Sequence, residues 1–392
     1  MRVLGMISGT SHDGVDAAVV DFQLVDGALT GAVQHGSVTP YPVELRARLA
    51  ASLPPAATTL SEMCELDTLI GQAFAGVAAD VIAAAGEVDL IVSHGQTVFH
   101  WVEAGHALGT LQIGQPAWIA ELTGAPVVSD VRIRDITAGG HGAPLVSYLD
   151  MLLLAGQPGR SAALNLGGIS NMTVVDPPAA PYAFDIGPAN ALVDAVIMDS
   201  GTDPRGFDED GRMAASGTVH DGLLAALLAD PYYALPPPKS TGKEHFNGEY
   251  VRAAVARIGV KLATADLVAT LTELTICTVA SDVLAAGIEV VVASGGGCRN
   301  PVMMAGLQHA LPGVRIIRSD ELGAPADEKE AIAFALIGWC TIHGLPSNEP
   351  AATGASDRRV LGTITPGRTP LMLPPPLDSP IRSLSLRLEL DR

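Results

Sequence analysis

The first apolar segment of the chain, residues 2–7, is followed by a turn rich in glycine and hydroxyl groups. Glycines let a ligand approach the backbone closely, and Thr and Ser hydroxyls donate to phosphate oxygens. A carboxylate in such a turn, here Asp13, can hold magnesium through water. The turn fits a nucleotide's phosphates, although a plain hairpin turn is the alternative, because Gly, Ser and Asp are common in turns for conformational reasons alone. The candidate phosphate-binding residues are Gly9, Thr10, Ser11, His12, Asp13, Gly14, Val15 and Asp16.

Two further glycine-rich turns follow later in the chain. Gly167 and Gly168 lie in a turn that repeats the first pattern about 160 residues on, which indicates an internal duplication. Two such turns facing each other across a cleft would clamp a phosphate chain. The third turn, residues 294–301, contains Gly295, Gly296 and Gly297 and precedes a predicted helix. Because these glycines carry no side chains, a flat adenine or ribose can lie against the backbone and the helix N-terminus near Asn300.

A single aspartate, Asp185, stands in the segment FDIGPAN, residues 184–190. It follows a short apolar piece and precedes a Gly-Pro turn, after which a helix is predicted with Asn190 as its N-cap. One interpretation of Asp185 is a general base directed into a cleft. The other is that its carboxylate only caps that helix.

The elements that must position these residues alternate between strand and helix. Apolar segments on both sides of the first two turns predict two hairpins. Between the hairpins and after the second, helical spacing alternates with short apolar runs, which favours an α/β fold with two domains, each begun by a glycine-turn hairpin. The predicted helices are residues 60–85, 116–123, 190–199, 221–228, 249–258 and 266–286, and the predicted strands are 2–7, 15–22, 90–93, 126–129, 162–166, 172–175, 289–293 and 359–364.

The bulk composition limits the classes of function. A length of 392 residues favours two domains with a cleft between them. The formal net charge of -19 repels nucleic acids and anionic lipid surfaces, so neither is expected as a partner. Four widely spaced cysteines suggest neither a zinc site nor a disulfide framework. No secretory signal is visible, and residues 331–342, an uncharged apolar run, are too short to span a bilayer, so we expect a cytoplasmic protein.

Many ordered motifs make the sequence resemble the anhydro-N-acetylmuramic acid kinase family, within the superfamily of acetate and sugar kinases, heat-shock ATPases and actin. The resemblance runs over nearly the whole chain, to about residue 367. The motifs are MISGTSHDGVDA at the start, SHGQTVFH at 93–100, TLQIGQPAWIAELTGAPVVSDVR at 110–132, GGHGAPLV at 139–146, NLGGISNMT at 165–173, FDIGPAN at 184–190, PPPKSTGKEHFN at 236–247, SGGGCRNP at 294–301 and EAIAFA at 330–335.

The resemblance implies two actin-like, ribonuclease-H-like α/β domains with mixed sheets flanked by helices and an active-site cleft between them. We expect a first domain from residues 1–128 plus about 350–370 and a second from residues 129–349. The first would carry the phosphate-binding hairpin, and the second the catalytic aspartate and the adenosine loop. Residues 371–392 would form an edge strand or a loosely held tail.

The resemblance also implies the ligands and their contacts. ATP phosphates, with Mg²⁺, would lie on residues 9–16, adenosine near residues 295–300, and a sugar between the domains. Asp185 would be the catalytic base, Arg132 would contact the sugar and Glu330 would lie near its ring. His94, Gln96, Thr97 and Asn190 complete the expected sugar contacts. Each of these contacts has another interpretation. Arg132 could form an ion pair with Asp130 or Asp135, and His94 could simply be hydrogen-bonded in place. Glu330 could stand at the start of a helix only because the helix dipole stabilises a carboxylate there.

The family reaction follows from these pieces. Asp185 would take a proton from water attacking the anomeric carbon, and the departing 6-oxygen would attack the γ-phosphoryl group of ATP. The sequence departs from the family pattern at several positions, some of them expected near the sugar: His12, Gln115, Val131, His141, Ile186 and Ala189. The alternatives are therefore a kinase of another 1,6-anhydro sugar such as levoglucosan, or a non-catalytic sensor of ATP and sugar. Besides the small-molecule sugar, a second copy of the chain, forming a homodimer, is a candidate partner.

Overall fold

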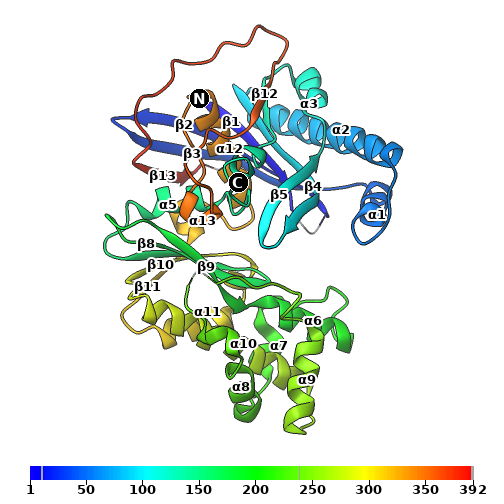
Figure 1. Cartoon of the computed structure of the whole chain (residues 1–392), viewed down its shortest axis with the longest axis vertical. Coiled ribbons are helices and arrows are strands. Elements are labelled where there is room, and N and C mark those ends of the chain that lie inside the picture. Colours follow the sequence, from blue (N-terminus) through cyan, green and yellow to red (C-terminus); the bar gives the residue numbers. More distant parts are fainter. Residues whose placement is uncertain (10–11, 238, 390–392) are drawn as a thin grey trace. The chain divides into compact units, whose positions relative to one another are not determined.

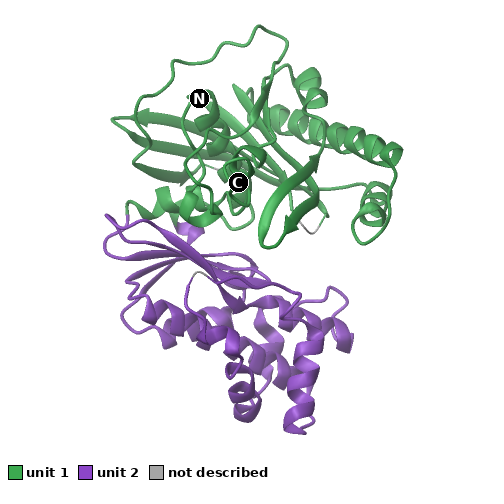
Figure 2. Ribbon diagram, in the orientation of Figure 1, with its two compact units in different colours: residues 1–156, 322–392 green, residues 157–321 purple. Residues whose placement is uncertain are grey.

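The computed structural model describes residues 1–9, 12–237 and 239–389, so the expected phosphate ligands Thr10 and Ser11 lie outside the described residues. The chain divides into two compact units, residues 1–156 with 322–392, and residues 157–321 (Figure 2). Each unit contains its own sheet, with helices packed against it (Figure 1). The predicted α/β fold with two mixed sheets is therefore confirmed.

The first unit is built on an eight-stranded sheet in the order β12-β6-β4-β1-β2-β3-β13, with β5 paired to β4. β1 pairs antiparallel with β2, which confirms the first predicted hairpin, and parallel with β4. β13 pairs parallel with β3, so the C-terminal segment contributes an edge strand. The strands are β1 (Arg2–Ser8), β2 (Gly14–Val25), β3 (Ala28–Pro40), β4 (Leu90–Glu103), β5 (His106–Ile113), β6 (Val127–Ser129), β12 (Thr363–Thr365) and β13 (Ser383–Leu388).

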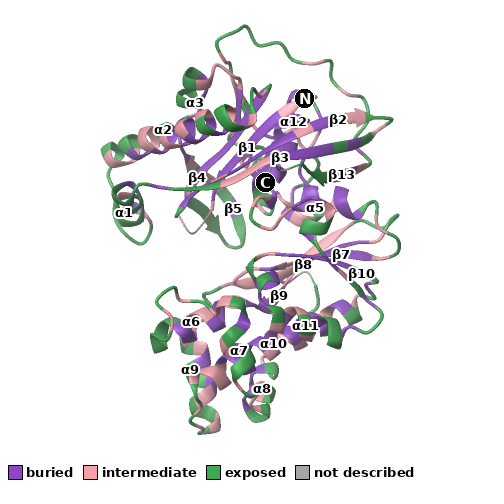
Figure 3. Ribbon diagram, turned by 180° about the vertical axis from the view of Figure 1, so that it is seen from behind, coloured by how far each residue is buried: buried purple, intermediate pink, exposed green. Residues whose placement is uncertain are grey.

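Helices cover both faces of this sheet, and the central strands are buried between them (Figure 3). α1 (Val43–Ser52), α2 (Leu60–Ala85) and α3 (Pro116–Thr123) pack on one face; α5 (Ser147–Leu154) and α12 (Lys329–Ile342) pack on the other. α12 approaches β1 so closely that a methyl group at Gly5 would stand 2.0 Å from the Ala331 carbonyl oxygen. Only glycine fits there, and the contact fixes the start of α12 against the strand that leads into the first glycine turn. Two short helices, α4 (Ile133–Ile136) and α13 (Pro350–Thr353), complete the unit.

The second unit has a five-stranded sheet in the order β11-β10-β7-β8-β9. β7 and β8 form the second predicted hairpin, and β9 pairs antiparallel with β8. α10 and α11 pack on the sheet, and a second apolar cluster joins α6, α8, α9 and α10. The elements are β7 (Ser161–Leu166), β8 (Ile169–Val175), β9 (Tyr182–Pro188), α6 (Asn190–Ser200), η1 (Glu209–Gly211), α7 (Arg212–Ser216), α8 (Asp221–Leu228), η2 (Pro231–Ala234), α9 (Gly248–Ile258), α10 (Thr264–Ala285), β10 (Val290–Ser294), η3 (Gly296–Arg299), α11 (Pro301–Ala310), β11 (Arg315–Arg318) and η4 (Ser319–Leu322), the last at the boundary with the first unit.

Two helices among the described residues, α2 and α10, are long and apolar enough to cross a membrane by length and composition alone. Within the protein, 67% of the most apolar window of α10 and 39% of that of α2 are buried. Core helices of globular proteins pass the same test, so this composition is weak evidence for a membrane span.

Candidate active site

The first glycine turn is held in place by a buried glutamine. Gln96 is fully buried on β4, where its Oε1 accepts a hydrogen bond from Ser8 Oγ at 2.6 Å. Its Nε2 donates to the carbonyl oxygens of Gly9, at 3.2 Å, and Thr97. Both ends of the amide are therefore engaged. Gln96 supports the turn, and its expected contact with the sugar stays a prediction.

The far side of the same turn is fixed by the neighbouring strand β3. A methyl group at Gly14 would stand 2.3 Å from the Thr39 carbonyl oxygen, so this glycine is required by the approach of β3. His12 adopts a left-handed backbone with φ of 54°, and burial lowers the pKa of its ring. The carbonyl of Asp13 accepts from the Tyr41 backbone N–H at 2.9 Å, while the Asp13 side chain is exposed at the tip of the turn.

Arg132 and His94 form a pair next to the turn. Arg132 donates from Nε to His94 Nε2 at 2.7 Å and from Nη1 to the Gly142 carbonyl at 2.7 Å. Because Nε2 accepts, the His94 ring proton lies on Nδ1, which donates to the Gly95 carbonyl. Burial, with the Arg132 charge, lowers the pKa of His94 to about 3, so this ring is neutral. His94 therefore positions Arg132, whose Nη2 donates to no group within the described part of the chain.

The loop that supplies the Gly142 carbonyl is tied down by a fully buried carboxylate, Asp135. Its Oδ2 accepts from the Gly142 backbone N–H at 2.8 Å. Its Oδ1 accepts from Asn348 Nδ2 at 2.6 Å and from Thr353 Oγ1 at 2.7 Å. Asp135 is thus satisfied by neutral donors, and the alternative ion pair between Arg132 and Asp135 is not among the described contacts.

Carboxylates gather where α12 begins. The desolvated carboxyl of Asp16 on β2 has its pKa raised to about 6, first by burial and then by the charges of Glu330, Asp13 and other acidic residues. Desolvation also raises the pKa of Glu330, against the opposing charges of Arg132 and Lys329. The first unit therefore places the first glycine turn, Arg132 and Glu330 within electrostatic reach of one another.

In the second unit, Asp185 on β9 is held at three of its four polar atoms. Its backbone N–H donates to the Lys239 carbonyl at 2.9 Å, and its backbone carbonyl accepts from Tyr232 Oη at 2.7 Å. Carboxylate Oδ2 accepts from Ser240 Oγ at 2.7 Å and from the Thr241 N–H at 3.0 Å. Within the described residues nothing donates to Oδ1, which leaves that oxygen available to a ligand or water. Asp185 does not cap α6.

Sequence reasoning missed the residues that orient this carboxylate. Ser240 and Thr241 belong to the motif PPPKSTGKEHFN, which was recognised as a family match without any role for its residues. The available signal was a polar, glycine-containing segment after three prolines, which is typical of an ordered loop rather than a helix.

The second and third glycine turns meet in this unit. Asn190 donates from Nδ2 to the carbonyls of Gly167 and Leu166 at 2.8 and 3.2 Å, so it ties the second turn to α6 rather than capping the helix. Ala189 occupies the N-cap position. A methyl group at Gly295 would stand 2.9 Å from the Leu166 carbonyl oxygen, which brings the third turn against the second. At Gly296 a methyl group would meet nothing nearer than Asn190 Nδ2, at 4.0 Å, so this side of the turn is open.

Two neighbours of the third turn have structural tasks. Gly297 packs on Leu166, where a methyl group would stand 2.7 Å from Cβ. Asn300 caps α11, accepting from the backbone N–H groups of Val302 and Met303. The expected adenosine contact of Asn300 therefore cannot use its side-chain oxygen without releasing the cap.

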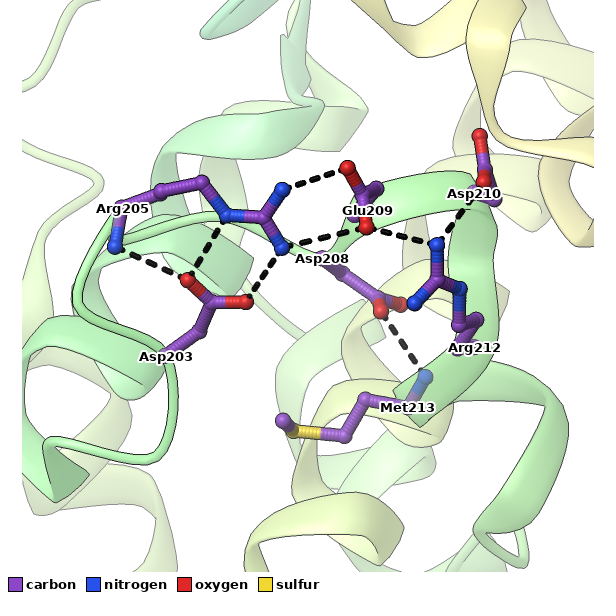
Figure 4. A network of polar contacts seen from close by, with 7 residues as sticks. All are labelled: Asp203, Arg205, Asp208, Glu209, Asp210, Arg212 and Met213. Atoms are coloured by element: carbon purple, nitrogen blue, oxygen red, sulfur yellow. Dashed lines mark hydrogen bonds and ion pairs between the residues drawn. The ribbon is translucent and has the colours of Figure 1, made fainter.

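A loop braced by charged residues lies against Asn300. Arg205 binds Asp203 and Glu209, Arg212 binds Glu209 and Asp210, and Asp208 accepts from the Met213 backbone N–H at 2.8 Å (Figure 4). A methyl group at Gly211 of this loop would stand 2.2 Å from Asn300 Oδ1. A single exposed ion pair contributes little stability, but here several charged residues are linked in one network. We therefore interpret the network as a brace that fixes the loop beside the third turn.

Three of the six departures from the family pattern, Val131, Ile186 and Ala189, are buried. Val131 and Ile186 are 1% and 0% exposed and belong to apolar clusters of the first and second unit, respectively. Ala189 is buried at the start of α6, and Gln115 precedes α3 without a side-chain cap. Val131 and Ile186 therefore contribute to the packing of their own units.

No group of three or more His, Cys, Asp or Glu residues that could hold a metal ion occurs among the described residues. A magnesium ion that keeps its waters and binds nucleotide phosphates needs only one or two protein carboxylates. The crowded carboxylates of Asp13 and Asp16 suit that mode, because a divalent cation would offset their mutual repulsion.

Comparison with known proteins places these features in a family. A family model described as anhydro-N-acetylmuramic acid kinase matches residues 1–367. The anhydro-N-acetylmuramic acid kinase of Streptomyces coelicolor is 54% identical over 386 residues, covering 98% of each chain. That of Rhodococcus erythropolis is 52% identical over 377 residues, covering 94% of each. A solved structure, the activator of the 2-hydroxyisocaproyl-CoA dehydratase from Clostridium difficile, is 12% identical with a TM-score of 0.41, covering 86% of this chain and 93% of that one. The chain belongs to the anhydro-N-acetylmuramic acid kinase family.

Proposed function

We propose that the protein is an ATP-dependent kinase that opens the 1,6-anhydro bridge of anhydro-N-acetylmuramic acid and phosphorylates its 6-oxygen. The product is N-acetylmuramic acid 6-phosphate, formed in cell-wall recycling. Family membership supports this reaction. The observation that carries the proposal is the arrangement at Asp185, where one carboxylate oxygen is held by two donors and the other is not engaged within the described chain.

The reaction needs a base beside the anomeric carbon, and Asp185 Oδ1 suits that task. It takes a proton from water as the water oxygen bonds to the anomeric carbon. The bond from that carbon to the 6-oxygen breaks, and the 6-oxygen attacks the γ-phosphorus of ATP, so that ADP leaves. The leaving oxygen needs no proton donor, because the phosphoryl group takes the proton's place.

The remaining site residues are assigned by chemistry. Arg132 Nη2 is a suitable donor to the lactyl carboxylate of the sugar, because Nε and Nη1 are already fixed by His94 and Gly142. Glu330 lies electrostatically close to Arg132 and is assigned to the sugar ring. The first glycine turn is assigned to the ATP phosphates with Mg²⁺ through water at Asp13, and the open side of Gly296 to adenosine. We propose the cytoplasm as the compartment.

The test is an ADP-release assay on wild type, Asp185→Asn and a matched control, Asp221→Asn, at an exposed carboxylate at the start of α8. Wild type should release ADP only when the anhydro sugar is present. Asp185→Asn should lower turnover at least about 100-fold, because it removes the base, with ATP affinity retained. The control should match wild type. Turnover above a tenth of wild type in Asp185→Asn would exclude Asp185 as the base.

A second arm tests the sugar. Levoglucosan has the same bridge and lacks the lactyl group. If Arg132 binds the lactyl carboxylate, Arg132→Ala should raise KM for the muramic sugar and leave the rate measured with levoglucosan at the wild-type value. Equal loss with both sugars would show that Arg132 does not recognise the lactyl group.

A further inference from the structure

Lys243 lies directly over the second glycine turn. A methyl group at Gly168 would stand 3.1 Å from Lys243 Cε and 3.7 Å from its Nζ, so the ammonium group is in contact range of the turn. Lys243 follows Ser240 and Thr241, which orient Asp185, by three and two residues. The segment that positions the base therefore also carries a cation to the glycine turn.

The backbone of the turn offers hydrogen-bond donors at the same place. The Gly167 carbonyl accepts from the Asn190 N–H, and the Gly168 carbonyl accepts from the N–H groups of Ala189 and Ala191. Both carbonyls thus face the start of α6. The N–H groups of Gly167 and Gly168, by contrast, donate to no acceptor within the described chain. Two adjacent unengaged N–H groups beside an ammonium group make an anion-binding site.

The other lysines have different tasks, which makes Lys243 distinctive. The chain contains four lysines. Lys239 pairs with Asp282 at 3.3 Å and Lys329 pairs with Asp150 at 2.6 Å, and both are buried. Lys261 is exposed on the connection between α9 and α10. Among the described residues, Lys243 makes no ion pair within 4 Å.

One carboxylate is close enough to compete with a bound anion. Asp194, on α6 one turn after Asn190, has its pKa raised to about 6 by burial, and the charge of Lys243 opposes the shift. Lys243 therefore has two readings: a structural partner that offsets the charge of Asp194, or a ligand for an anion at the turn. The unengaged N–H groups favour the second, because a structural partner would not require them.

We propose that Lys243 binds the β- and γ-phosphates of the nucleotide, beside the second glycine turn that the sequence analysis already expects to clamp the phosphate chain. Within the reaction proposed above, on which this inference rests, Lys243 offsets the charge on the transferring phosphoryl group. The two neighbours of Gly242 thus act on different substrates: Thr241 orients the base for the sugar, and Lys243 binds the phosphate chain.

The experiment measures the affinities of ATP, ADP and AMP with Mg²⁺ by titration calorimetry, without sugar. The variants are Lys243→Met, Lys243→Arg, Asp194→Asn and the control Lys261→Met, which changes net charge equally on an exposed loop. Lys243→Met should weaken ATP and ADP about 10- to 100-fold, the range for a hydrogen bond to a charged group. AMP should be unaffected, and Lys243→Arg should restore most of the loss. Lys261→Met should match wild type.

Each other result overturns the inference. Unchanged ATP affinity in Lys243→Met excludes a phosphate contact. Equal weakening of AMP indicates a general change of the fold. If Asp194→Asn reproduces the loss seen in Lys243→Met, the role of Lys243 is to offset Asp194; a phosphate ligand predicts unchanged or tighter ATP binding in Asp194→Asn, since a nearby negative charge is removed.

The nucleotide affinities distinguish a failure of this inference from a failure of the proposed function. If wild type shows the expected nucleotide pattern but releases no ADP with the anhydro sugar, the reaction proposal fails and the phosphate site stands. If wild type releases ADP and Lys243→Met does so with unchanged kcat and KM for ATP, the phosphate site fails and the reaction proposal stands.

Discussion

The buried ion pair between Lys239 and Asp282, next to the residues that hold Asp185, can be tested by the substitution Lys239→Met. The Lys239 side chain is 3% exposed, and its Nζ lies 3.3 Å from Asp282 Oδ2. The same ammonium group lies over the rings of Tyr232 and Phe184, at 5.2 and 5.8 Å from their centroids. Methionine keeps the apolar stem and removes the charge, so the substitution leaves Asp282 without its partner and opens no large cavity.

The size of the effect follows from these contacts. Removing one member of a fully buried pair costs about 3–5 kcal/mol, because the other charge is left uncompensated. The Asp282 side chain is 22% exposed, so water offsets part of that cost, while loss of the cation–π contacts adds about 1 kcal/mol. We expect the unfolding free energy of the second unit to fall by about 3 kcal/mol, roughly a hundredfold in the folded-to-unfolded ratio.

The chain offers an internal control for this measurement. All three tryptophans, Trp101, Trp118 and Trp339, lie in the first unit. In urea, far-UV circular dichroism should therefore show an early transition in Lys239→Met that tryptophan fluorescence does not share. Because the Lys239 carbonyl and the next two residues hold Asp185, kcat at low denaturant should fall more than KM for ATP changes.

The double variant Lys239→Met/Asp282→Leu supplies the decisive comparison. It removes both charges and should recover most of the lost stability, since a buried pair can be replaced by apolar residues at little cost. If Lys239→Met changed stability by less than 1 kcal/mol and left kcat intact, the pair would not anchor the loop, and the reasoning above would be refuted.

Two further predictions concern the first unit. His94 has a folded pKa of about 3 against an ordinary value of 6.5, so its contribution to stability is complete above pH 6.5 and declines as the pH falls toward 3. The urea midpoint of wild type, followed by tryptophan fluorescence, should therefore drop more between pH 7.5 and 5 than that of His94→Gln; equal drops would contradict a neutral His94. Asp135→Ala removes the acceptor of three buried hydrogen bonds and should cost about 3 kcal/mol, with KM for the sugar raised because Gly142 no longer fixes Arg132. Unchanged KM in folded Asp135→Ala would show that the loop does not position Arg132.

The sequence predicted those features that local pattern determines. The helix predicted over residues 60–85 matches α2, because Thr59 accepts from the Glu62 N–H at its start and Gly86 ends it. Both glycine-turn hairpins are confirmed for the same reason: the apolar segments on each side of the turn are consecutive in sequence and pair with each other.

Features that depend on distant partners were not predicted. The strand expected over 90–93 extends to Glu103 because it pairs with β5, which the polar, mixed pattern of residues 106–113 did not indicate. The strand expected over 359–364 is restricted to Thr363–Thr365, since it pairs only with the three residues of β6. Asn190 binds carbonyls of the second turn instead of capping α6.

The site shows the same division. Asp185 could be selected from FDIGPAN, but its orienting donors, Ser240 and Thr241, come from a segment 55 and 56 residues away. The partners of Asp135 are 213 and 218 residues away. Such pairings are set by tertiary packing, which the periodicity of a single sequence does not indicate.

The composition of the first unit has a consequence for synthesis on the ribosome. Its sheet is mostly encoded by residues up to Ser129, yet α12, which covers one face, begins at Lys329, about 200 residues later. The second unit, residues 157–321, is continuous and leaves the exit tunnel whole before α12 does. Until α12 is made, α5 is the only long helix of the described chain that can cover this face, so the part that α12 buries stays exposed while the inserted unit is completed. During that interval the exposed apolar surface can bind chaperones or aggregate.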